Sequence, residues 1–65
     1  MDIHDLKIFL MIAQACSVSK ASKILYMTPQ GTSKVLKNLE TEMGCQLFIR
    51  DKSGMQLTES GERFR

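Results

Sequence analysis

The sequence predicts a small, mainly helical α+β domain with three helices, a two-stranded β hairpin and the start of a fourth helix. Three observations lead to this prediction. The chain has 65 residues, 43% of them hydrophobic and 25% charged, as in an ordinary globular domain. Apolar residues recur at helical spacing as far as Met43. After Gly44 the pattern becomes that of short strands separated by turn residues.

The first two predicted helices are amphipathic. One spans residues 3–15, with Asp2 as its N-cap. The other is expected to begin with Ser19 as its N-cap and to end near Tyr26. The side chains expected to face the core are Leu6, Phe9, Leu10 and Ala13 in the first helix and Ala21, Ile24 and Leu25 in the second.

The third predicted helix spans residues 29–43. Thr28 is its expected N-cap, Pro29 suits the first helical position, and Gly44 is the expected C′ residue. At about 100° per residue, one face collects Thr32, Val35, Leu36, Leu39 and Met43, and the opposite face collects Gln30, Lys34, Lys37 and Thr41, with Ser33 beside it. The polar face therefore carries cations and hydrogen-bonding groups, with no acid before Glu40.

The remainder of the chain is predicted to form a hairpin and a last helix. Residues 46–50 and 55–57 have the pattern of strands joined by a turn at 51–54. Thr58 is expected to cap the helix that follows. We therefore expect one domain over residues 1–57 and the start of a linker helix over 58–65. Because this helix reaches Arg65 without a C-cap, we expect the chain to be a piece of a longer protein.

The charges are unevenly distributed along the sequence. The formal net charge is only +2. The segment between Leu6 and Leu39, however, holds no acidic residue and five lysines: Lys7, Lys20, Lys23, Lys34 and Lys37. A positive surface of this kind suits a polyanionic partner, and a merely solvated lysine face is the alternative.

Several functional classes are disfavoured by composition. Cys16 and Cys45 are too few for a disulfide scaffold, and His4 alone does not complete a zinc site with them. We expect two buried free thiols in a reducing cytosol. The apolar run 8–13 is too short to span a membrane. We expect no enzyme, because the sequence shows no base–nucleophile pair, metal cluster or glycine-rich phosphate loop.

The predicted order of elements is that of a winged helix-turn-helix domain. In such a domain the third helix enters the major groove of DNA, and the hairpin, or wing, reaches the backbone or the minor groove. A three-helix bundle with solvating lysines would more often mix Glu with Lys on its polar face. The alternative function is a protein-interaction module, and salt-dependent binding to a duplex separates the two.

Specific motifs identify a family that the sequence resembles. Leu47-Phe48-Ile49-Arg50 is followed, seven residues after the arginine, by Leu57-Thr58-Glu59-Ser60-Gly61. Further matching segments are residues 1–3 with Leu6 and Phe9, 17–22 leading to Leu25, 28–34, 39–40 and 43–44. Over essentially the whole chain, the sequence resembles the N-terminal DNA-binding domain of LysR-type transcriptional regulators.

This resemblance implies a cytoplasmic, nucleoid-associated bacterial transcription factor that binds double-stranded DNA sequence-specifically. Full-length members add a linker helix that dimerises and a large domain that binds a small co-inducer. We therefore expect a homodimer or tetramer of the full-length protein and no cofactor in this chain. Two departures stand out. Pro29 and Gln30 exchange the usual order of Gln and Pro, and Lys34 replaces a common arginine.

The candidate DNA-binding residues come from three elements. They are Thr28, Pro29, Gln30, Ser33, Lys34 and Lys37 at the turn and on the third helix, Arg50 and Lys52 on the wing, and Lys20 on the second helix. Gln30 is the candidate for reading an adenine edge, and Arg50 and Lys52 are expected to meet phosphate. For Tyr26, a phosphate contact through the hydroxyl and packing in the core are both open.

We predict that the 65-residue chain is mostly monomeric in dilute solution and binds DNA weakly. A dimer that reads two half-sites gains from effective concentration, and the linker helix that would join the halves is cut at Arg65. Sedimentation velocity checks this expectation. A tight dimer at micromolar concentration would contradict it.

Overall fold

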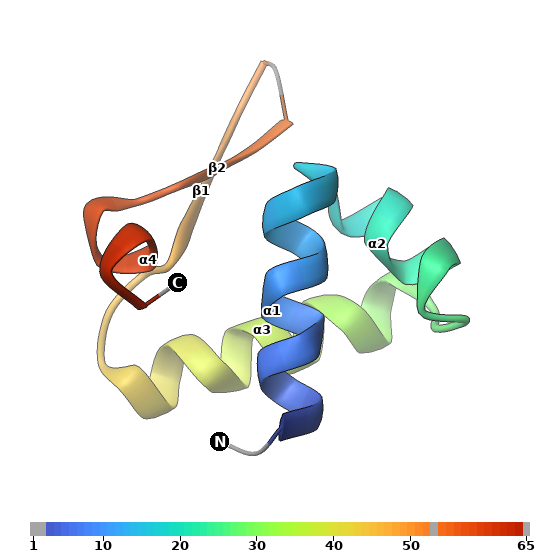
Figure 1. The fold of residues 1–65 in the computed structure, drawn as a ribbon, viewed down its shortest axis with the longest axis horizontal. Coiled ribbons are helices and arrows are strands. Elements are labelled where there is room, and N and C mark those ends of the chain that lie inside the picture. Colours follow the sequence, from blue (N-terminus) through green and yellow to red (C-terminus); the bar gives the residue numbers. More distant parts are fainter. Residues whose placement is uncertain (1–2, 53, 65) are drawn as a thin grey trace.

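A computed structural model describes residues 3–52 and 54–64 of the chain. Its elements are α1 (Ile3–Ala15), α2 (Val18–Ile24), α3 (Pro29–Met43), β1 (Phe48–Asp51), β2 (Gly54–Leu57) and α4 (Glu59–Phe64). Figure 1 shows α1 crossing α3, with α2 on one side of α1 and the hairpin and α4 on the other. This arrangement confirms the predicted winged helix-turn-helix. The expected N-cap Asp2 and the turn residue Ser53 lie outside the described residues.

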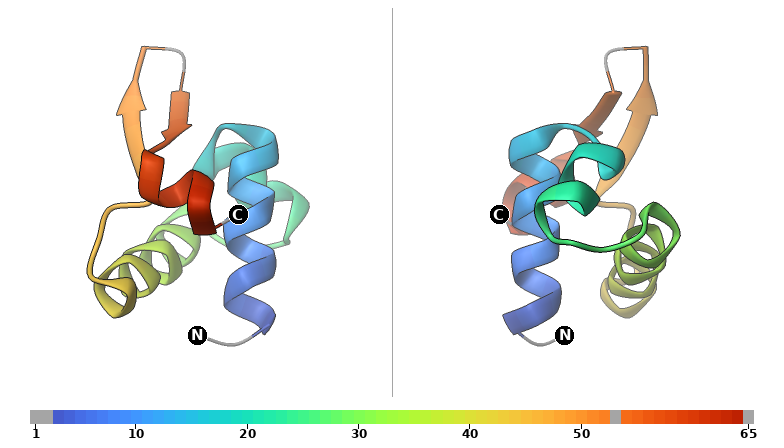
Figure 2. Two further views of the ribbon diagram at one scale, coloured as in Figure 1. Left: turned by 60° about the vertical axis from the view of Figure 1, so that its left-hand side comes forward. Right: turned by 90° about the vertical axis from the view of Figure 1, so that its right-hand side faces the viewer.

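The hairpin is a two-stranded antiparallel sheet that projects away from the helices (Figure 2). Phe48 pairs with Leu57 and Asp51 pairs with Gly54. The prediction of a strand over 46–50 was therefore displaced by one to two residues. The reason is that Leu47 makes its backbone hydrogen bonds elsewhere: its N–H donates to Glu40 and its carbonyl accepts from Thr58.

The hydrophobic core lies between α1 and every other element. Its buried apolar residues are Ile8, Phe9, Ile12, Val18, Ala21, Leu36, Leu39, Leu47 and Phe48. The Phe9 ring lies 5.4 Å from the Phe48 ring and 4.9 Å from the Phe64 ring, measured between centroids. Phe9 thus joins α1 to both the wing and α4.

Three expectations about the core were wrong. In α1 the buried stripe is Ile8, Phe9 and Ile12, whereas Leu10 is 37% exposed. Apolar residues surround most of α1, so its periodicity allowed more than one stripe, and packing against α2, α3 and the wing selected among them. Ile24 and Met43, each in the last turn of its helix, are 55% and 42% exposed because those turns extend beyond the core.

The helix ends show which local signals were correct. Thr28 caps α3, and Gly44 ends it in the left-handed conformation at φ 73°, as predicted. For α2 the prediction was wrong by two residues, since the cap is Ser17, whose extended backbone lets its hydroxyl accept the Lys20 N–H at 3.2 Å. Cys16 ends α1 at φ 55°. It is exposed and Cys45 is half-buried, so the two thiols are not buried as expected.

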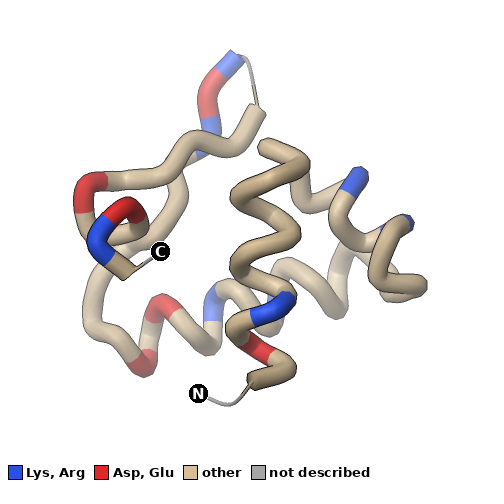
Figure 3. The backbone as a smooth tube through the Cα atoms, viewed as in Figure 1, with Lys and Arg blue, Asp and Glu red and all other residues tan. Residues whose placement is uncertain are grey.

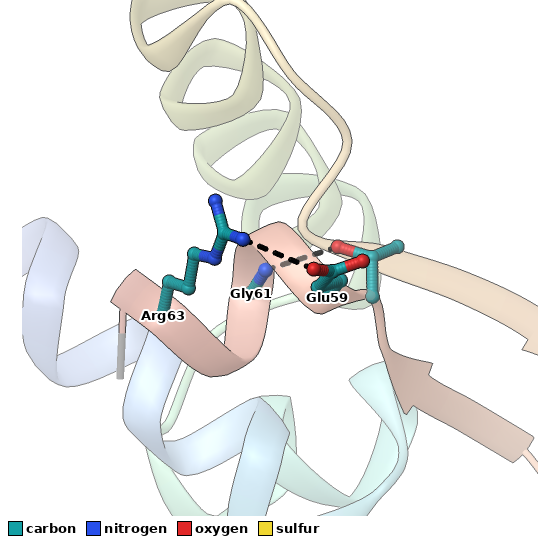
Figure 4. Close-up of polar contacts among 4 residues, drawn as sticks. Glu59, Gly61 and Arg63 are labelled. Carbon is teal, nitrogen blue, oxygen red and sulfur yellow. Dashed lines mark hydrogen bonds and ion pairs between the residues drawn. The ribbon is translucent and has the colours of Figure 1, made fainter.

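The start of α4 is attached closely to the segment that leads into the wing. Thr58 caps α4, as predicted, by accepting the Gly61 N–H at 3.0 Å, and its own hydroxyl donates to the Gln46 carbonyl at 2.6 Å. Figure 4 shows this turn and the exposed Glu59–Arg63 pair beside it. Gly61 is buried, and a Cβ there would lie 2.3 Å from the Leu47 carbonyl oxygen.

We predict that Gly61→Ala destabilises the fold by about 1–3 kcal/mol, the usual cost of overpacking. A loss of stability would be informative, because replacing Gly by Ala inside a helix ordinarily stabilises the protein by about 1 kcal/mol. Here the new methyl group must displace the backbone at Leu47. Urea unfolding measures the change. The control Ser60→Ala, one residue away on the same helix, should stay within about 0.5 kcal/mol of the wild type, and an equally stable Gly61→Ala would refute the prediction.

Candidate nucleic-acid interface

The first turn of α3 is held rigidly by the two threonines near its start. The Thr28 hydroxyl accepts the Gly31 N–H at 3.0 Å. The Thr32 hydroxyl, which is fully buried, donates to the Thr28 carbonyl at 3.0 Å. Pro29 adds a fixed φ at the first helical position. These contacts give the residues that follow a defined orientation.

The two faces of α3 separate as predicted except at Met43, which is exposed. Thr32, Leu36 and Leu39 are buried against the rest of the domain. Gln30, Ser33, Lys34 and Lys37 are exposed on the surface. The helix thus presents a row of donors and cations that the core does not use, which confirms the predicted polar face.

Three elements meet at a groove beside the start of α3. It is lined by Pro29, Gln30 and Ser33 from α3, Val18 and Ser19 from α2, and Arg50 from β1. The structure therefore brings four of the predicted binding residues together: Pro29, Gln30, Ser33 and Arg50. We call this site the α2–α3–wing groove.

The other predicted residues lie around this groove. Lys52 and Arg50 line a neighbouring hollow between the wing and the start of α2. Lys20 is exposed on α2, and Lys34 and Lys37 lie farther along α3. Thr28 is exposed but its hydroxyl already serves as the cap. Of the nine predicted binding residues, four therefore line the groove, and the other five, which are four lysines and Thr28, lie around it.

Ser19 is a groove residue that the sequence reasoning missed. It was assigned the role of N-cap, which Ser17 performs. The exposed Ser19 lines both the groove and the neighbouring hollow. The sequence signal for a binding role was its position next to Lys20. Because α2 was predicted to begin two residues too late, Ser19 was assigned to capping instead.

The wing is held next to the helices by a backbone contact with the end of α1. The Met55 N–H donates to the Cys16 carbonyl at 2.9 Å. A Cβ at Gly54 would lie only 2.5 Å from that same oxygen, and Gly54 has a φ of 119°. Both the close approach and the backbone conformation therefore require glycine.

Basic side chains outnumber acidic ones around the groove, where Asp51 is the acidic residue on the wing, between Arg50 and Lys52. In the described residues 3–52 and 54–64, the lysines of α2 and α3 make no ion pair, whereas His4 pairs with Asp5 and Glu59 pairs with Arg63. Figure 3 shows acidic positions on α4, on the C-terminal half of α3, near the start of α1 and on the wing, where the acidic position lies between two basic ones. The charged residues of α2 and of the first half of α3 are therefore all basic.

Tyr26 lies in the turn between α2 and α3. It is 96% exposed, which excludes the alternative that it packs in the core. Its backbone is left-handed at φ 57°, and the following Met27 N–H donates to the Ser22 carbonyl at 2.8 Å. Tyr26 thus occupies the position that ends a helix and is usually filled by glycine.

None of the helices that the structure describes is long and apolar enough to cross a membrane. The family model for "bacterial regulatory helix-turn-helix protein, lysR family" matches residues 3–62. The chain is 35% identical over 65 residues to the HTH-type transcriptional activator IlvY of Salmonella typhimurium, covering 100% of this chain and 22% of that protein. It is 44% identical over 57 residues to the uncharacterized HTH-type transcriptional regulator YwbI of Bacillus subtilis, covering 88% of this chain and 19% of the other. The chain thus spans about a fifth of the length of these relatives.

Solved structures have the same fold. The DNA-binding domain of CbnR, solved in a complex with DNA, superposes with a TM-score of 0.92 at 30% identity, over 98% of this chain and 74% of that one. The DNA-binding domain of BenM, in a complex with catB site 1 DNA, gives a TM-score of 0.93 at 30% identity, over 98% and 72% of the two chains. The similarity includes the wing and α4 as well as the three helices.

Proposed function

Because the chain belongs to the lysR family of bacterial regulatory helix-turn-helix proteins, we propose that it binds double-stranded DNA sequence-specifically. It acts as the DNA-binding domain of a transcriptional regulator. The observation that carries this proposal is the α2–α3–wing groove, which Gln30 and Ser33 of α3 line together with Arg50 of the wing. Two similar domains in complexes with DNA support it.

In this proposal, α3 enters the major groove with its first turns nearest the bases. Gln30 can donate and accept at an adenine edge through its amide. Ser33 and Lys34 follow on the same side, and Lys37 reaches the phosphate backbone. Pro29 has neither an N–H nor a polar side chain, so it orients the helix without reading a base by hydrogen bonds.

The remaining cations contact the backbone on either side of α3. Arg50 and Lys52 on the wing meet phosphates or the minor groove, and Lys20 on α2 meets a phosphate. These contacts carry no base information but hold the register of α3 on the duplex. The free energy of binding is therefore divided between a salt-dependent cationic contribution and a smaller contribution from base readout.

Salt titration of duplex binding tests the proposal. We expect the logarithm of the association constant to fall linearly with the logarithm of salt concentration, because cationic side chains that bind DNA phosphates release counterions from the DNA.

Lys37→Ala should weaken binding to all duplexes alike and lower this slope by roughly one. Fluorescence anisotropy with labelled duplexes measures both. Salt-independent or undetectable binding would favour a protein-interaction module, and an unchanged slope would remove Lys37 from the phosphate contacts.

Gln30→Ala should relax the base preference at one position and leave non-specific affinity nearly intact. The amide of Gln30 discriminates its base by about 1–3 kcal/mol through paired hydrogen bonds, whereas non-specific affinity comes from cations that the variant retains. Binding-site selection with wild type and variant shows the difference. If the two preference profiles coincide, Gln30 does not read the base, and Ser33 or Lys34 must do so.

A further inference from the structure

The side chain of Glu40 joins α3 directly to the start of the wing. One of its carboxylate oxygens, Oε2, accepts the backbone N–H of Leu47 at 2.7 Å and that of Phe48 at 3.2 Å. Glu40 lies in the last turn of α3, and Phe48 is the first residue of β1. A single oxygen on the recognition helix thus receives two consecutive N–H groups at the point where the chain enters the wing.

Water cannot easily replace this carboxylate. Leu47 is fully buried and Phe48 is 3% exposed, so their N–H groups lie where solvent has little access. Hydrogen bonds to an ionised acceptor are shorter and stronger than neutral ones. Without Glu40, two buried donors would lose their partner, and the strand entrance would have to shift toward solvent or find another acceptor.

Arg50 lies two residues beyond Phe48 on the same strand. Alternate residues of a strand point to the same face, so Arg50 shares the face of Phe48. Phe48 packs on Phe9 in the core, and Arg50 continues from there to the α2–α3–wing groove beside Gln30. The position of Phe48 therefore determines where the strand that carries Arg50 leaves the core and passes the start of α3.

We propose that Glu40 is a positioning residue for Arg50: it sets the contribution of the wing to DNA affinity without contacting DNA. This inference rests on the proposed function. Its physical basis is that α3 carries both the base-reading side chains and the carboxylate that holds the wing. Displacement of the wing relative to α3 thus requires breaking bonds to α3 itself.

A double-mutant cycle with Glu40→Ala and Arg50→Ala tests this coupling. In the wild type, Arg50→Ala should weaken duplex binding roughly tenfold, as for loss of one charge-assisted hydrogen bond. In the Glu40→Ala background the same change should weaken binding by about threefold or less, because Arg50 is no longer held in place. Anisotropy titrations at one salt concentration give all four affinities.

Glu42→Ala is the matched control. It removes the same negative charge from an exposed position two residues away on α3. Loss of an acid raises affinity for DNA non-specifically, and this control corrects for that effect. In the Glu42→Ala background, Arg50→Ala should still weaken binding roughly tenfold.

Glu40→Gln provides a second variant, because its amide oxygen still accepts the two N–H groups but carries no charge. The Arg50 effect should then lie between those in the wild type and in Glu40→Ala, and circular dichroism establishes which variants fold. If Glu40→Ala does not fold, Glu40→Asn decides, because its side chain is one methylene shorter and withdraws the acceptor from the two N–H groups: a reduced Arg50 effect supports the inference and an unchanged one overturns it. An equal Arg50 effect in wild type and folded Glu40→Ala overturns the inference alone, whereas failure of the wild type to bind any duplex overturns the proposed function as well.

Discussion

Phe9 lies where the helical part of the molecule meets the wing and α4. Its ring contacts Phe48 in β1 and Phe64 in α4, while its neighbours Ile8 and Ile12 are buried with it. A chain of 65 residues can build only one core, so every element has to share it. The orientation of the wing relative to α3 is therefore established in part through α1, on which both pack.

Around this core the wing is held by contacts of the backbone itself. Gly54 approaches the Cys16 carbonyl, and Gly61 approaches the Leu47 carbonyl, at distances that leave no space for a side chain. Glu40 adds a carboxylate from α3 to the same junction. A two-stranded hairpin is only marginally stable alone. These attachments to α1, α3 and α4 explain how so short a hairpin keeps Arg50 at a defined place.

The same packing leaves the opposite face of α3 available for binding. Thr32, Leu36 and Leu39 are the buried positions of this helix, so Gln30, Ser33 and Lys34 have no part in the core. Their identities can vary without loss of the fold.

Much of the local structure could be predicted from residues close together in the sequence. Thr28, Pro29 and Gly44 delimit α3, and Thr58 begins α4, because capping depends on groups within four residues of each other. The polar face of α3 was predictable for the same reason, since helical spacing alone separates it from Leu36 and Leu39.

Other features depended on segments far apart in the chain. The apolar side chains of α1 point in most directions around its axis. Only its contacts with the other elements show that Ile8 and Ile12, rather than Leu10, are buried. Local spacing gives no signal that Arg50 and Gln30 line one groove or that Glu40 accepts the Phe48 N–H. Caps and helical faces are set within one or two turns, whereas the groove exists only once α2, α3 and the wing have packed on one core.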